Sequence, residues 1–159
     1  MPESPSTITI GLESPYANGI EELLRLGAEY SLSLYPPEEC FLLTPAELDE
    51  PGVRLFVARD DAGGALAMGA LVARHDEGEL KRMFVHPDSR RLGLASRILT
   101  RIEDAAMAQG LPRLVLETGP LHDAALAFYR RHGYVPIPRF GPYVGSPSSV
   151  CFAKELGAS

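Results

Sequence analysis

The sequence predicts a single α/β domain over residues 1–159, built on a sheet of about seven strands. Three observations predict this fold class. The chain is 45% hydrophobic and 23% charged, a composition typical of a globular protein with one core. Strand-like runs and amphipathic helical segments occur along its whole length. Three of the strand-like runs follow one another closely, separated only by turn signals, and we find no internal repeat.

The first half predicts a strand, two helices and an antiparallel meander. Alternating side chains predict a strand at residues 7–12, and apolar spacing over 20–28 predicts a helix with Asn18 as its cap. Residues 44–47 have the Thr, Pro and Glu of a capping box, which marks a short helix. Turn-forming residues separate the strands of the predicted meander: 54–59, 65–74 and 79–85.

The second half predicts two more helices and three more strands. One apolar face runs through residues 94–106 and stops at Gly110, so a helix is expected there. A strand at 113–118 precedes a helix at 122–131. The last two strands are expected at 134–137 and 148–154. Since a core-like strand follows it, the segment rich in Pro and Gly between them is interpreted as a shaped loop.

Charge and cysteine content exclude several classes of function. The net charge of −6 argues against a general nucleic-acid binder, because neutralising phosphates needs a basic face. Two isolated cysteines, Cys40 and Cys151, predict neither a disulfide framework nor a metal site. Positive charge nevertheless gathers within residues 81–101, which favours a small anionic ligand. Its members are Lys81, Arg82, Arg90, Arg91, Arg97 and Arg101, with a solvated helix face as the alternative for the last two.

The sequence gives no sign of membrane targeting. Residues 1–7 have neither a basic segment nor an apolar one, and the longest apolar run, at 65–73, is too short to span a bilayer. We therefore expect a cytoplasmic protein without a membrane partner. The oligomeric state is left open, with a homodimer as one alternative.

The segment Arg90-Arg91-Leu92-Gly93-Leu94-Ala95 joins a predicted strand to a predicted helix. Backbone N–H groups of such a loop, together with the positive end of the helix dipole, bind phosphate. Small residues at positions 93 and 95 would let a pyrophosphate approach the backbone closely. The hexapeptide thus predicts a phosphate-binding loop, and an ordinary surface turn into a helix is the alternative.

The order of elements and two motifs resemble the GNAT superfamily of N-acetyltransferases over nearly the whole chain. The first motif is the 90–95 loop after Val85-His86-Pro87, and the second is Phe128-Tyr129 followed by Gly133-Tyr134. The closest resemblance is to small, single-domain bacterial members. It implies a mixed, mainly antiparallel twisted sheet with helices on both faces, and acetyl-CoA as the acetyl donor.

The resemblance also implies which residues hold the cofactor. The pantetheine arm would lie along the strand before the loop, and the pyrophosphate would lie on the loop amides. Carried over to this sequence, the set is Met83, Phe84, Val85, Arg90, Arg91, Leu92, Gly93, Leu94, Ala95, Ser96 and Phe128. His122 stands where the family often has an Asn that contacts the cofactor, so that contact is not carried over.

For catalysis, the resemblance implies direct transfer of the acetyl group to an amine. Glu79 matches the position of a general base that acts directly or through water, and Tyr129 matches the general acid beside the sulfur of CoA. The alternatives are a surface glutamate at the start of a strand and a tyrosine that packs a helix.

The expected acceptor is a small-molecule amine, amino-acid-like in one version. Aromatic walls and a positive charge for any substrate carboxylate are predicted from Tyr30, Tyr35, Lys81, Arg82, Phe140 and Tyr143. Two alternatives stay open, namely acetylation of a protein or peptide and a non-catalytic acyl-CoA sensor.

Overall fold

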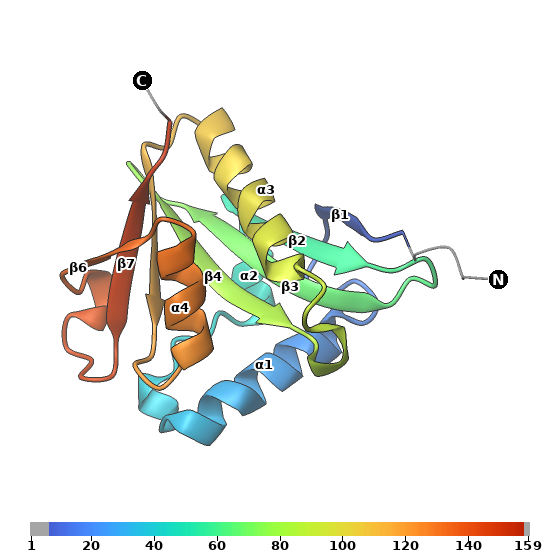
Figure 1. Cartoon of the computed structure of the whole chain (residues 1–159), viewed down its shortest axis with the longest axis horizontal. Coiled ribbons are helices and arrows are strands. Elements are labelled where there is room, and N and C mark those ends of the chain that lie inside the picture. Colours follow the sequence, from blue (N-terminus) through green and yellow to red (C-terminus); the bar gives the residue numbers. More distant parts are fainter. Residues whose placement is uncertain (1–6, 158–159) are drawn as a thin grey trace.

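The computed structural model describes residues 7–157, which form one seven-stranded sheet with helices packed on it (Figure 1). Its strand order is β1-β2-β3-β4-β5-β7-β6. The strands are β1 (Thr9–Leu12), β2 (Val53–Arg59), β3 (Ala65–Ala73), β4 (Gly78–Val85), β5 (Arg113–Thr118), β6 (Val135–Ile137) and β7 (Val150–Glu155). All neighbouring pairs are antiparallel except β4 and β5, which are parallel. The predicted mixed, mainly antiparallel sheet is confirmed.

The helices are α1 (Ile20–Leu34), α2 (Pro45–Leu48), α3 (Leu94–Ala108) and α4 (Asp123–Arg131). The capping box predicted for α2 is present, since Thr44 and Glu47 exchange side-chain to backbone hydrogen bonds of 3.2 and 3.0 Å. The cap predicted for α1 is wrong. Gly19, in the left-handed region at φ 85°, is its N-cap, and the Asn18 carbonyl instead accepts a hydrogen bond from Arg59.

Helices cover both faces of the sheet, as expected. Alternation along β2 sends Leu55 and Val57 into a core with α1 and α2, whereas Phe56 and Ala58 point into a second core with α3 and α4. In Figure 1, α3 and α4 lie on the near side of the sheet.

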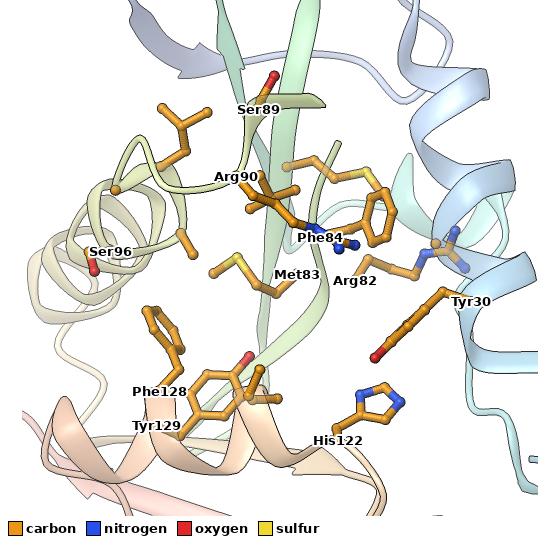
Figure 2. Close-up of a pocket in the computed structure, with 18 of the residues that line it drawn as sticks. Tyr30, Arg82, Met83, Phe84, Ser89, Arg90, Ser96, His122, Phe128 and Tyr129 are labelled. Carbon is orange, nitrogen blue, oxygen red and sulfur yellow. The ribbon is translucent and has the colours of Figure 1, made fainter. Parts of the chain in front are cut away.

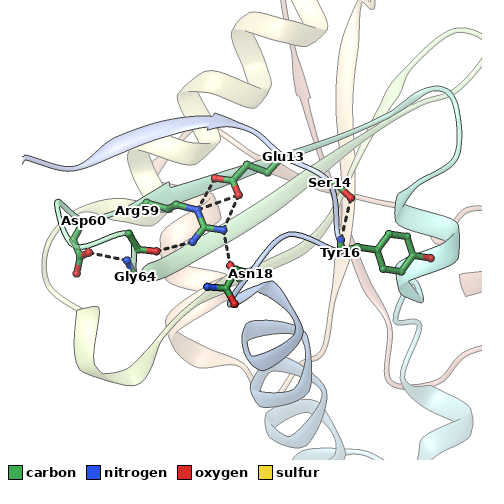
Figure 3. Close-up of polar contacts among 8 residues, drawn as sticks. Glu13, Ser14, Tyr16, Asn18, Arg59, Asp60 and Gly64 are labelled. Carbon is green, nitrogen blue, oxygen red and sulfur yellow. Dashed lines mark hydrogen bonds and ion pairs between the residues drawn. The ribbon is translucent and has the colours of Figure 1, made fainter.

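Arg59 fixes the start of α1 to the sheet (Figure 3). Its guanidinium donates to the Glu13 carboxylate at 2.7 to 3.0 Å, to the Gly63 carbonyl at 2.7 Å and to the Asn18 carbonyl at 2.6 Å. One side chain thus joins the end of β1, the β2–β3 hairpin and the turn before α1. These charge-assisted bonds orient a helix whose middle lines the cleft described below.

The cleft itself follows from two irregularities in β4. The β3–β4 register shifts between Met68 and Ala70, and opposite this shift Arg82 has a φ of 57°, so β4 contains a bulge there. Pairing of β4 with β5 ends at Leu80 and Leu116. Because both strands continue beyond these residues, they splay apart.

Candidate active site

A cavity of about 530 Å³ lies between β4, the loop before α3, and helices α1 and α4 (Figure 2). We call it the first cavity. Of the predicted cofactor residues, it is lined by Met83, Phe84, Val85, Arg90, Arg91, Gly93, Leu94, Ala95, Ser96 and Phe128. Leu92 does not line it, since its side chain is exposed to solvent. Except for Leu92, the structure brings this predicted set together around one space.

The loop at one end of the first cavity is shaped to bind an anion. Arg91 and Gly93 both have left-handed backbone conformations, with φ of 69° and 71°. Such residues turn successive N–H groups toward one side of the chain. Gly93 is also the N-cap of α3 and provides no side-chain cap, so the first amides of a 15-residue helix stay available.

Two residues that sequence reasoning missed, His132 and Arg131, hold the cavity wall. His132 Nε2 lies 3.0 Å from Ser96 Oγ, and its ring packs on Phe128 with 4.5 Å between centroids. Arg131 lines the cavity as well, with its guanidinium 6.0 Å from the Phe128 ring centre. Sequence spacing alone does not reveal the contact of His132 with α3.

The predicted cluster of positive charge does not gather at one place. Its members Arg82, Arg90 and Arg91 line the first cavity, where Arg131 adds a positive charge from outside the cluster. Arg97 instead donates to the carbonyl of Ile8, just before β1, at 3.2 Å. Arg101 donates to the carbonyl of Ile10, within β1, at 2.6 Å. The latter pair therefore stabilises an edge strand and does not contribute to the cavity.

A second cavity of about 150 Å³ occupies the splay between β4 and β5. It shares Arg82, Met83, His122 and Tyr129 with the first, so the two spaces adjoin. Glu117 lines it from β5 and Lys81 lines it from β4. Tyr35, just after α1, lines it as well. An elongated ligand in the first cavity would thus end where the second begins.

Tyr129 of α4 lines both cavities at their junction. In Figure 2 its side chain extends from α4 toward the strand that carries Met83. Burial raises the pKa of the Tyr129 phenol above its usual value, so the phenol is neutral at physiological pH. Its hydroxyl makes no side-chain hydrogen bond with any residue in the range 7–157. A neutral, unengaged phenol here can donate a proton.

Glu79 does not line either cavity. It is 2% exposed, and its carboxylate accepts hydrogen bonds from Arg74 at 2.7 Å and from the Tyr143 hydroxyl at 2.6 Å. The Tyr143 hydroxyl in turn accepts from Lys81 Nζ at 2.6 Å. Glu79 could reach an amine only through this network or a water, so its role as base stays a prediction.

Phe140 and Tyr143 are not in the cavity walls where we expected them. Tyr143 is 1% exposed, and its ring packs edge-on against Phe41 and Phe140 at 5.0 and 5.1 Å. The reason is the hydroxyl, which reaches the buried charges of β4 and fixes the late loop there. The structure thus gives these two aromatics an anchoring position, one layer behind the second cavity.

The other predicted acceptor residues do reach the cleft. Tyr30 lines the first cavity, and Tyr35 lines the second with its hydroxyl accepting from the Leu121 N–H at 2.7 Å. Both rings pack on His122, at 5.1 and 5.6 Å. Burial lowers the pKa of His122, and its Nε2 is sealed without a partner among residues 7–157, so the imidazole is neutral.

Glu117 is a charged residue of the second cavity that sequence reasoning missed. Burial raises the pKa of this carboxyl, against the smaller lowering effects of a hydrogen bond from Ser149 and the charge of Lys81. A carboxylate in such surroundings is a stronger base than one in water. The only sequence signal was a Glu near the end of a predicted strand.

Comparisons with known proteins decide the family. The model of the "Acetyltransferase (GNAT) family" matches residues 19–134. The chain belongs to this family. It is 38% identical over 151 residues to an IAA acetyltransferase of Azospirillum brasilense, covering 94% of this chain and 98% of that one. As an N-acetyltransferase of this family, the chain uses acetyl-CoA as its acetyl donor.

Solved structures agree with the fold. A Klebsiella pneumoniae protein, provisionally assigned as an acyl-CoA N-acyltransferase, aligns with a TM-score of 0.79 and 29% identity, covering 94% of this chain and 98% of that one. A GNAT family acetyltransferase from Elizabethkingia anophelis, crystallised with acetyl-CoA bound, aligns with a TM-score of 0.68 and 17% identity over 94% and 98% of the two chains. At 17% identity, this second similarity supports the fold alone.

Among the described residues, no helix is long and apolar enough to cross a membrane. Within residues 7–157, no group of three or more His, Cys, Asp or Glu side chains is placed to hold a metal ion.

Proposed function

We propose that this acetyltransferase transfers the acetyl group to a small-molecule amine bound in the second cavity. The observation that carries the proposal is the junction of the two cavities at Tyr129. A donor held in the first cavity and an acceptor held in the second would meet at this phenol. Holding the two reactants in one orientation supplies much of the rate gain of a direct transfer.

Each part of the cleft has a physical task in this proposal. The amides after Arg90 would bind the pyrophosphate, and the apolar wall of Met83 and Phe128 would bind the pantetheine arm. Tyr129, neutral because burial raises the pKa of its phenol, would give its proton to the leaving thiolate. The acceptor needs only a neutral amine within reach of the thioester carbonyl.

The size and polarity of the second cavity support a small acceptor. At about 150 Å³ it lies below the ~300–1,000 Å³ typical of pockets for drug-sized ligands. The name of the Azospirillum brasilense relative, an IAA acetyltransferase, is consistent with a small-molecule substrate. An acyl-CoA sensor without acceptor chemistry would have no need of an unengaged phenol at the junction.

A peptide acceptor has one observation in its favour. A groove of about 480 Å³ between the segments 36–41 and 142–147 shares Glu39 and Phe41 with the second cavity. An extended chain end lying in this groove would approach the same junction from outside. Acetylation of peptides alone, with every small amine refused, would favour this alternative.

The proposal is tested by replacing Tyr129 with Phe. We expect kcat for thiol release to fall about 100-fold or more, the range for loss of a general acid, while the Kd of acetyl-CoA changes little. Tyr134→Phe is the matched control, because Tyr134 is equally buried but donates to Glu103 outside the cleft. Wild-type kcat in Tyr129→Phe would contradict the role of this phenol.

A further inference from the structure

The charged side chains of the second cavity differ in how far the protein itself satisfies them. Lys81 is fully engaged, since it donates to the Tyr143 hydroxyl at 2.6 Å and to the Phe41 carbonyl at 2.9 Å, and it lies 3.9 Å from the buried Glu79 carboxylate, which offsets its charge. Glu39 accepts one hydrogen bond, from Ser148 Oγ at 2.8 Å, and lies where the cavity meets the outer groove between segments 36–41 and 142–147. The two remaining charges, Arg82 and Glu117, lie on the two strands that form the cavity.

Arg82 and Glu117 are satisfied only in part. Arg82 donates from Nη2 to the Leu24 carbonyl at 2.7 Å, and Glu117 accepts at Oε2 from Ser149 Oγ at 2.7 Å. Within residues 7–157, neither has an oppositely charged side chain within 4.0 Å. Burial lowers the pKa of Arg82 to about 10 and raises that of Glu117, the mark of charges held without counter-ions.

The remaining polar atoms of these two side chains are not sealed from solvent. Of the described residues, only His122 Nε2 and Ser146 Oγ are polar side-chain atoms that are sealed from solvent without a partner. Nε and Nη1 of Arg82 and Oε1 of Glu117 are therefore accessible. Both side chains line the second cavity, one from β4 and one from β5.

We propose that the acceptor carries both an amine and a carboxylate, as a free amino acid does, with its carboxylate on Arg82 and its amine on Glu117. This inference rests on the proposed function and names the substrate class for the same cavity. A guanidinium offers a carboxylate two parallel N–H groups, from Nε and Nη2 or from Nη1 and Nη2, and Nη2 of Arg82 has a second N–H besides the one on the Leu24 carbonyl. The small volume restricts the acceptor to a compact amino acid or an analogue of similar size.

The same placement gives Glu117 a step in the reaction. Its carboxylate accepts a proton from the bound ammonium, and the neutral nitrogen attacks the thioester carbonyl to form the C–N bond. The C–S bond then breaks, Tyr129 donates its proton to the sulfur, and the nitrogen's remaining extra proton restores the phenol. The products are an N-acetyl amino acid and CoA thiol, and one proton passes from Glu117 to solvent.

The test compares ligands that differ only in the carboxylate. Thiol release at saturating acetyl-CoA is measured with free L-amino acids and, for each, with its amide and its decarboxylated amine. We expect kcat/KM at least 10-fold higher for the free acid. Arg82→Gln is expected to remove this preference by raising KM for the acid 10-fold or more, with the Kd of acetyl-CoA unchanged. Arg82→Lys is expected to restore part of it.

Arg113→Gln is the matched control, since Arg113 is partly buried and pairs with Glu77 outside the cleft. Equal kcat/KM for acid and amide in the wild-type chain overturns the inference, and this comparison needs no variant to fold. An Arg82→Gln variant that weakens only the binding of acetyl-CoA also overturns the inference. Either result leaves the proposed function intact if amines without a carboxylate are acetylated. Acetyl-CoA binding without acetylation of any small amine defeats both.

Discussion

At the scale of single residues, Tyr129 and Glu117 line one cavity from two different elements, and burial raises the pKa of both. The same shift has opposite consequences for the two groups. The phenol keeps its proton and stays a donor, whereas the carboxylate holds a captured proton more strongly. Transfer of an acetyl group from a thioester to an amine needs such a proton donor for the thiolate and such a proton acceptor for the amine.

The pH dependence of kcat/KM distinguishes the two candidate bases. Because burial raises the pKa of Glu117, its carboxylate should lose activity by protonation as the pH falls through that raised value. We therefore expect Glu117→Gln to lower kcat/KM and to remove the acidic limb of the profile. Glu79→Gln is the matched variant, and it should keep the limb because Glu79 lines neither cavity.

The reverse pattern, with the limb lost only in Glu79→Gln, would return the base role to the residue that the sequence first indicated. The charges of Lys81 and Glu79 on β4 act on the proton affinity of Glu117. The Glu117 charge in turn raises the pKa of the neighbouring groups Tyr35, Cys40, Tyr143 and Cys151.

The residues whose position in the cleft depends on local sequence were the ones that could be predicted. The amides of 90–96 and the phenol at 129 follow from motifs at fixed spacing. Glu117 could not be found in this way, because only the splay of two strands turns one end of β5 toward a cavity. The prediction that Tyr143 lines the acceptor site did not match the structure. Its sequence neighbours do not reveal that its hydroxyl donates to Glu79, 64 residues away.

At the scale of elements, the phosphate-binding loop depends on the left-handed Gly93 at the start of α3. No atom lies within 4 Å of a Cβ added there, so a larger side chain would occupy the space over the amides and strain the backbone. Gly93→Val should therefore raise the Kd of acetyl-CoA at least 10-fold in calorimetry, while the folded state persists.

Gly110 provides the control at the other end of the same helix. Its φ is 75°, and the space around its added Cβ is equally open, but it lines neither cavity. Gly110→Val should thus lose a similar amount of stability, about 1–2 kcal/mol, and keep its affinity for acetyl-CoA. Equal affinities in the two variants would show that the loop does not bind the pyrophosphate.

Element positions were predictable because periodicity and turn chemistry are local. The capping box at Thr44 and the meander of β2, β3 and β4 were expected from sequence alone. The Asn18 cap was wrong because Arg59, 41 residues away, takes the carbonyl of Asn18 and Gly19 supplies the turn. Long-range contacts of this kind override local preference and leave no mark in the local sequence.

At the scale of the whole molecule, the sheet determines the cleft. Two cores hold helices on opposite faces, and the bulge at Arg82 and the parting of β4 from β5 open the sheet between them. The first cavity lies on one side of this opening and the second lies within it. In the proposed function, donor and acceptor would therefore approach the same phenol from different directions, as direct transfer between two bound substrates requires.

The central claim is that the donor fills the first cavity with its sulfur at Tyr129 and leaves the second cavity for the amine. A crystal structure of the chain with CoA tests this most directly. We expect the pyrophosphate on the amides of residues 91–96, the pantetheine arm beside Met83 and Val85, and the sulfur within hydrogen-bond reach of the Tyr129 hydroxyl. Pantetheine that occupies the second cavity, or a sulfur remote from Tyr129, would contradict the account.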